Sequence, residues 1–235
     1  MKNLLFFSIA LILTSCIQTS YYQVFTTTPT KTINPPERHA IITYDLWNNG
    51  GVIVCSIYNS GTEDIIVDLT KSFLVLNGTA NEYFQNRTFT TSALKESTYV
   101  SRFVPTVTSA IGSGVTISDK KELTIPPKSR IVLSQFNLVD ERYSNCDLKK
   151  TPLSKDPKSV KFDRENSPIV ANSIISYTYG TSFERAENEF YVSEIGNYLM
   201  SNLYETVKPD CNHKYSILRM KQQGANKFYF KYSGL

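Results

Sequence analysis

The fold class is decided by three adjoining runs: Ala40-Ile41-Ile42-Thr43-Tyr44-Asp45-Leu46, Asn48-Asn49-Gly50-Gly51 and Val52-Ile53-Val54-Cys55-Ser56-Ile57-Tyr58. The first and third runs have the period of two that is typical of strands with one buried face. The Asn and Gly residues of the middle run readily adopt the positive φ angles that tight turns need. The stretch therefore predicts a β-hairpin, with Cys55 as a buried free thiol that behaves like a small apolar side chain.

The same alternation recurs along much of the chain. Asn77-Gly78 is the strongest short turn signal, and the 15 Tyr and 13 Phe residues favour strands over helices. We predict one all-β domain over residues 39–235, an immunoglobulin-like β-sandwich. Its further strands are expected at Ile65–Leu69, Phe73–Leu76, Thr79–Phe84, Glu122–Ile125, Arg130–Phe136, Ile174–Tyr179, Glu187–Ile195 followed by a short helical turn, Tyr215–Met220 and Phe228–Tyr232.

Three segments lack this pattern. Residues 16–38 are rich in Thr and Pro and predict a tether, although Tyr21–Phe25 could dock as a short edge strand. Residues 88–119 are rich in Ser, Thr and Gly, which predicts a long mobile loop and the best candidate for a contact surface. Asp147–Ser167 carries five lysines and reads as a solvated loop.

The N-terminus has the features of an export signal. Lys2 precedes an apolar run from Leu4 to Leu13, which is too short for the roughly 20 residues of a membrane-spanning helix. The run ends in Leu13-Thr14-Ser15-Cys16, which resembles the lipobox of bacterial lipoproteins. That resemblance implies a signal peptide over residues 1–15 and a lipid on Cys16, which would anchor the protein to a membrane.

The charge of the chain bears on its partners, and its cysteines predict one disulfide bond. The formal net charge is +4, of which Lys2 contributes one, and the charges are interleaved, so no nucleic-acid partner is expected. Cys146 and Cys211 lie in polar, turn-rich surroundings, and in an exported protein they are the predicted disulfide. This bond would close a loop of about 66 residues and stabilise the fold by roughly 4 kcal/mol.

No motif for a cofactor, a metal ion or a catalytic residue stands out. Cys211-Asn212-His213 offers too few ligands for a structural zinc site, so no metal is expected. Paired carboxylates can hydrolyse a glycosidic bond when they are held at the right separation. Four glutamates cluster around Arg185 in the sequence, so an envelope glycan hydrolase is an alternative function. They are Glu184, Glu187, Glu189 and Glu194.

Four further segments carry a family resemblance: Tyr21–Phe25, Asp68–Gly78, Ile125–Ser129 and Asn188–Ile195. Together they resemble a group of uncharacterised lipoproteins from Gram-negative gut anaerobes. None of the segments is a catalytic signature, so the resemblance implies an envelope location but no activity. Lipoproteins that such bacteria send to the cell surface often have acidic residues just after the anchor, and Ile17–Ser20 has none. The resemblance therefore favours the periplasmic face of the outer membrane.

We therefore expect a lipid-anchored, non-catalytic envelope protein that binds or braces an envelope protein or glycan. The glycan hydrolase is one alternative. A second alternative is a pilin-like surface subunit that is trimmed at Arg38 and polymerises by strand exchange.

Overall fold

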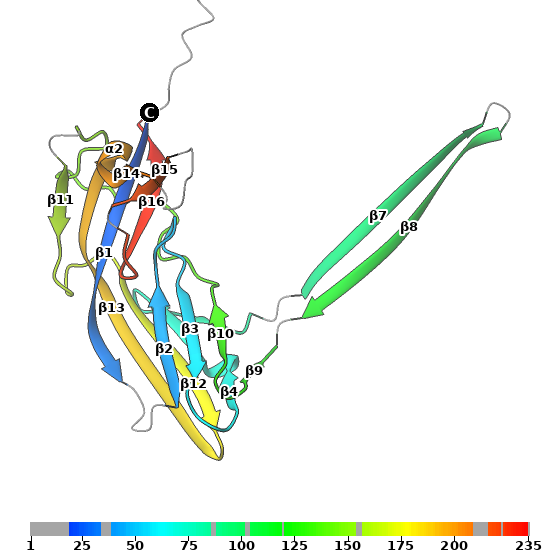
Figure 1. Cartoon of the computed structure of the whole chain (residues 1–235), viewed down its shortest axis with the longest axis horizontal. Coiled ribbons are helices and arrows are strands. Elements are labelled where there is room, and N and C mark those ends of the chain that lie inside the picture. Colours follow the sequence, from blue (N-terminus) through cyan, green and yellow to red (C-terminus); the bar gives the residue numbers. More distant parts are fainter. Residues whose placement is uncertain are drawn as a thin grey trace, which may run out of the picture.

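The computed structural model describes residues 19–33, 39–85, 88–101, 104–118, 120–153, 157–208, 216–221 and 223–234. The described chain is almost entirely β-structure in antiparallel sheets, and its two larger sheets pack face to face as a sandwich (Figure 1). The prediction of an all-β sandwich is therefore confirmed.

The first sheet has nine strands, and its main path runs in the order β16-β1-β13-β12-β4-β9. Three further strands branch from this path: β11 pairs with β13, and β5 pairs with both β12 and β6. The bounds of these strands are β1 Ser20–Ile33, β4 Ile65–Asp68, β5 Phe73–Leu76, β6 Thr79–Glu82, β9 Glu122–Ile125, β11 Lys158–Lys161, β12 Val170–Tyr179, β13 Ser182–Leu199 and β16 Lys227–Ser233.

The second sheet has three strands in the order β10-β3-β2, with bounds Arg130–Leu133, Val54–Asn59 and Ala40–Asp45. Cys55 and Ile57 of β3 are fully buried and pack against Val67, Ile175 and Tyr177 of the first sheet. This contact forms one core of the sandwich. It also confirms the alternation that the sequence predicted, because every second residue of β3 faces inward.

Both predicted turns have the required backbone conformation. Asn77 and Gly78 have φ angles of 48° and 83° and join β5 to β6 as a two-residue hairpin. Gly50 and Gly51 have φ angles of 82° and 66° between β2 and β3. A Cβ atom on Gly51 would lie 2.7 Å from the Phe228 ring, so packing as well as φ requires glycine there.

The predicted tether is wrong for Ser20–Ile33, because this segment forms β1 of the first sheet. β1 pairs with β13 on one side and β16 on the other, so it is not an edge strand either. Phe25 of β1 is fully buried and stacks on Phe228 of β16 with ring centroids 4.5 Å apart. Buried aromatic contacts of this kind outweigh the poor strand propensity of Pro29 in the same strand.

The predicted loop over residues 88–119 is also wrong. Two long strands, β7 (Thr88–Ser101) and β8 (Val104–Ser118), pair with each other along nearly their whole length. Figure 1 shows this hairpin extending away from the sandwich. The abundant Thr and Val residues favour extended backbone even though no apolar period marks a buried face.

The C-terminal part of the chain closes one end of the sandwich. β13 continues past the predicted end at Ile195 to Leu199, and the predicted short helical turn then follows as the helix α2 (Met200–Leu203). β14 (Tyr204–Val207) and β15 (Ile217–Met220) then form a separate two-stranded sheet. A short 3-10 helix, η1 (Leu69–Lys71), lies between β4 and β5.

Candidate functional site

The predicted lipid site and one predicted disulfide partner lie outside the described residues. They are Cys16 and Cys211, and the predicted signal peptide (residues 1–15) and His213 lie outside them too. Cys146 is an exposed free thiol in the loop before β11. The pairing of Cys146 with Cys211 therefore stays a prediction.

Cys55 occupies the position that the sequence predicted. Its side chain is fully buried and forms no disulfide. Burial raises the pKa of the Cys55 thiol to about 12, because a thiolate would be desolvated there. This thiol is a packing group of the core rather than a nucleophile.

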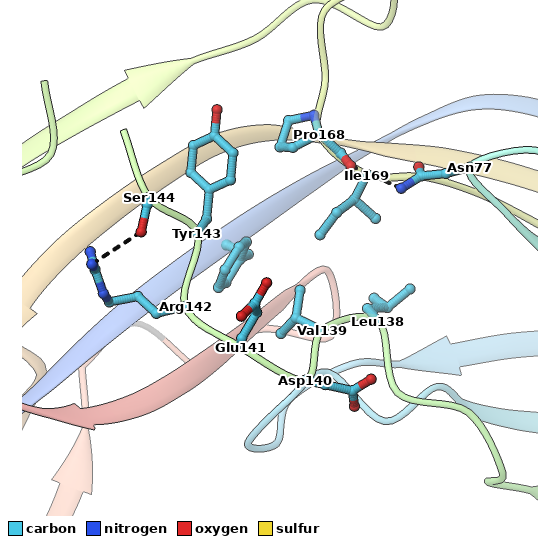
Figure 2. A pocket seen from close by; sticks show the side chains of 11 residues that line it. Asn77, Leu138, Val139, Asp140, Glu141, Arg142, Tyr143, Ser144, Pro168 and Ile169 are labelled. Atoms are coloured by element: carbon cyan, nitrogen blue, oxygen red, sulfur yellow. Dashed lines mark hydrogen bonds between the residues drawn. The ribbon is translucent and has the colours of Figure 1, made fainter. Parts of the chain in front are cut away.

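The four glutamates of the hydrolase alternative are spread along β13 rather than gathered in one cavity. Ala186 and Phe190 of this strand face the core, and Glu187 and Glu189 alternate with them on the other side. Glu184 lies on the core side and accepts a hydrogen bond from the Tyr177 hydroxyl. None of the four lines the pocket in Figure 2.

Two of these glutamates are held in ion pairs. Arg164 donates two hydrogen bonds to the Glu189 carboxylate, at 2.7 and 3.1 Å, and Lys31 lies 3.4 Å from Glu187. The bonds from Arg164 and Thr30 lower the pKa of Glu189. A general acid needs a raised carboxyl pKa, so the environment of Glu189 favours a structural role for this residue.

A pocket of about 360 Å³ lies instead beside the segment Leu138–Ser144 (Figure 2). This segment forms one wall, and Asn77, Pro168 and Ile169 form the opposite one. Phe25 of β1 also lines the pocket. The volume falls within the range of pockets that hold small ligands, which is about 300–1,000 Å³.

A buried amide of the first sheet holds one wall of the pocket in place. Gln23 of β1 is fully buried, and its side chain accepts a hydrogen bond from the Tyr143 amide at 2.7 Å and donates one to the Tyr143 carbonyl at 3.0 Å. Gln23 also donates to the side-chain oxygen of its cross-strand neighbour Asn197, at 2.8 Å. Asn197 in turn donates to the Lys149 carbonyl at 2.9 Å. Two side chains on adjacent strands thus fix a loop that has no regular secondary structure of its own.

The hairpin turn that decides the fold also supports this wall. The amides of Leu138 and Val139 donate to the carbonyl of Gly50 at 3.2 and 3.1 Å. On the opposite wall, Asn77 donates to the Pro168 carbonyl at 3.0 Å and accepts from the Val170 amide at 2.8 Å. The pocket is therefore preformed by backbone contacts from distant parts of the chain.

The polar groups at the pocket suit binding better than glycosidic hydrolysis. Figure 2 shows the Glu141 side chain pointing towards the middle of the pocket and Asp140 pointing away from it. A glycosidase needs two carboxyl groups facing one bond, and these neighbours do not face each other. Arg142 donates to the Ser144 hydroxyl at 3.1 Å and lies 5.5 Å from the centre of the Tyr232 ring. Glu141 and Tyr143 are the groups left to contact a polar ligand.

Sequence reasoning missed this pocket. Gln23 and Tyr143 are 120 residues apart, and neither lies in a recognisable motif. The one available signal was a glutamine within an otherwise apolar and aromatic run, Tyr21-Tyr22-Gln23-Val24-Phe25. A polar side chain at such a position must find a hydrogen-bond partner if the run is buried.

The described part of the chain has neither a cluster of metal-ligating side chains nor a membrane-spanning helix. No three His, Cys, Asp or Glu side chains there lie close enough together to hold a metal ion. None of the described helices is long and apolar enough to cross a membrane. Comparison of the chain with protein-family models, with curated proteins and with solved structures found no match.

Proposed function

We propose that this protein is a lipid-anchored, non-catalytic module of the bacterial cell envelope, in which an immunoglobulin-like β-sandwich binds or braces an envelope partner. The anchor is the lipid on Cys16, supported by the run Leu13-Thr14-Ser15-Cys16 after a short apolar segment. The sandwich is held at the outer membrane, on the periplasmic face.

The observation that carries the binding role is the long hairpin of β7 and β8. Among the described strands, these two pair only with each other, so each has one edge whose backbone amides and carbonyls are unpaired by the sheets. A strand of 14 or 15 residues is roughly 50 Å long. Isolated two-stranded hairpins are only marginally stable in water, so a partner that adds a strand would stabilise this one.

This geometry favours an extended protein segment over a glycan as the partner. A segment that pairs with the edge of β7 or β8 satisfies backbone hydrogen bonds without requiring a particular side chain. The pocket beside Leu138–Ser144 is too small for a folded domain, and it could hold a side chain or a small polar ligand.

The binding role is tested by shortening the hairpin. We expect a variant in which an Asn-Gly turn replaces residues 88–118 to fold like the intact chain, because among the described strands β7 and β8 pair with each other and with no strand of the sandwich. Both forms would be cross-linked to their neighbours in cell-envelope extracts, and the captured proteins would be identified by mass spectrometry. The intact chain should capture a defined partner that the shortened variant loses. Equal capture by both forms would contradict the role of the hairpin.

The anchor has its own test. Labelled palmitate should enter the wild-type protein and should not enter the Cys16→Ser variant. Equal labelling of the two forms, or no labelling of either, would contradict the lipid anchor.

The pilin-like alternative makes a different prediction. Cleavage at Arg38 would remove β1, which pairs with strands on both sides in the first sheet. A polymer built by strand exchange would have to supply a replacement for it from another copy. Laddered high-mass species on gels would favour this alternative, whereas an intact monomer that retains its palmitate would favour the anchored module.

A further inference from the structure

A second, larger groove of about 610 Å³ lies at the end of the sandwich where β1 begins. Figure 1 shows α2, β14 and β15 at this end, together with the C-terminus of the chain. Two large apolar side chains remain exposed on the groove, Met200 at 39% and Leu218 at 57%. Its lining also includes Ser20, Leu199, Tyr204 and Thr206.

The start of β1 sets how far this end can lie from the proposed anchor. Ser20 is already paired with Ser233 of β16, so the chain is fixed from this residue onward. Cys16 precedes Ser20 by four residues, and a fully extended chain covers at most about 3.6 Å per residue. A lipid on Cys16 would therefore hold this end of the sandwich within roughly 14 Å of the bilayer.

The segments that meet at this end carry an excess of positive charge. Among the described residues of these segments, the acidic ones are Asp147 and Glu205, and Arg219 lies 2.7 Å from the Glu205 carboxylate. Backbone contacts place four of the lysines at this end. The Lys149 carbonyl accepts a hydrogen bond from Asn197, and the Lys150 carbonyl accepts one from Tyr232. The Lys221 amide donates to the Leu203 carbonyl, and Lys231 pairs with Tyr22. A fifth, Lys208, directly follows β14. The exposed lysines at this end are Lys149, Lys150, Lys208, Lys221 and Lys231.

We propose that this end of the sandwich docks on anionic bilayer lipids. Met200 and Leu218 enter the boundary between headgroups and acyl chains, and the surrounding lysines contact the headgroups. Exposed apolar side chains bordered by lysines are the combination that binds membrane interfaces. The inference rests on the proposed anchor, because the short link from Cys16 is what brings this surface to the bilayer.

Vesicle binding by the unlipidated chain tests the docking surface without the anchor. The chain from residue 16 with Cys16→Ser retains every described residue and should sediment with phosphatidylethanolamine–phosphatidylglycerol vesicles more than with phosphatidylcholine vesicles. Added salt should weaken this binding. Lys208→Gln and Lys221→Gln should each reduce it about five-fold, the factor that corresponds to about 1 kcal/mol per cation near an anionic surface.

A matched pair of variants isolates the apolar contact. The double variant Met200→Ser and Leu218→Ser should lose binding at least several-fold. Phe183→Ser should retain it, because Phe183 is 58% exposed but lies by the β12–β13 turn at the opposite end of the sandwich (Figure 1). Circular dichroism would check that both variants remain folded.

Several results would overturn the docking surface. They are equal vesicle binding by the double variant and Phe183→Ser, no preference for anionic vesicles, and uptake of free palmitate by the groove without vesicle binding. The labelling of Cys16 is scored separately. Labelled Cys16 with no vesicle binding by the unlipidated chain refutes the docking surface alone, whereas vesicle binding without labelling refutes the anchor alone.

Discussion

Two buried tyrosines differ in whether their hydroxyl groups have a hydrogen-bond partner. The Tyr177 hydroxyl donates to Glu184 at 3.2 Å. Tyr83 is 1% exposed, and its hydroxyl lies near the Ser173 hydroxyl, yet neither group completes a hydrogen bond of normal geometry. An unsatisfied buried hydroxyl is costly, and burial accordingly raises the pKa of Tyr83.

Replacing each tyrosine by phenylalanine should therefore have different effects. Tyr83→Phe should leave the free energy of unfolding unchanged or raise it by about 1 kcal/mol, because it removes a polar group that gains nothing from folding. Tyr177→Phe should lower it by about 1–2 kcal/mol, because it breaks a bond to a carboxylate. Urea denaturation measures both. A loss for Tyr83→Phe as large as that for Tyr177→Phe would show that the Tyr83 hydroxyl has a partner, such as a buried water.

At the scale of elements, β1 connects the fold to the pocket. Gln23→Leu keeps the size of the side chain but removes its three hydrogen bonds to Tyr143 and Asn197. Each buried polar group left unpaired costs about 1–3 kcal/mol, so the free energy of unfolding should fall by roughly 2–5 kcal/mol. Backbone amide hydrogens of residues 138–149 should also exchange faster in this variant.

An exposed position on the same strand provides the control. Thr32 lies where β1 is exposed to solvent, so Thr32→Val should change the free energy of unfolding by less than about 0.5 kcal/mol. Unchanged exchange of residues 138–149 in Gln23→Leu would mean that other contacts, such as those to Gly50, suffice to hold the wall.

The elements also show what could be predicted from the sequence. Strands with a local signal were found: β5 and β9 occupy the predicted ranges Phe73–Leu76 and Glu122–Ile125. β1 was missed because its Thr and Pro content hides a strand whose burial depends on β13 and β16, more than 150 residues away. β7 and β8 were missed because their Ser, Thr and Gly content shows no apolar period, which is the main sequence signal for a strand.

At the scale of the whole molecule, the loop that carries Cys146 is fastened to the sheet through Asn197 and Gln23, while Cys211 follows β14. The predicted disulfide would therefore join this loop to the C-terminal part of the chain. Removing this bond with a reductant, or by Cys146→Ser, should lower the free energy of unfolding by roughly 4 kcal/mol on the chain-entropy model. For a domain of this size, about 2–4 °C of Tm corresponds to each kcal/mol, so Tm should fall by about 8–16 °C.

Counting reactive thiols decides whether this bond forms. The chain has four cysteines, one of which is the predicted lipid site. In the native oxidised protein no thiol should react with an alkylating reagent, because Cys146 and Cys211 are bonded and the pKa of the buried Cys55 is about 12. Reduction of the folded protein should expose Cys146 and Cys211, and unfolding should then add Cys55. Alkylation of Cys146 before reduction would instead mean that the free, exposed thiol of the structure is its native state, and that the end of the sandwich is held by packing and hydrogen bonds without a covalent link.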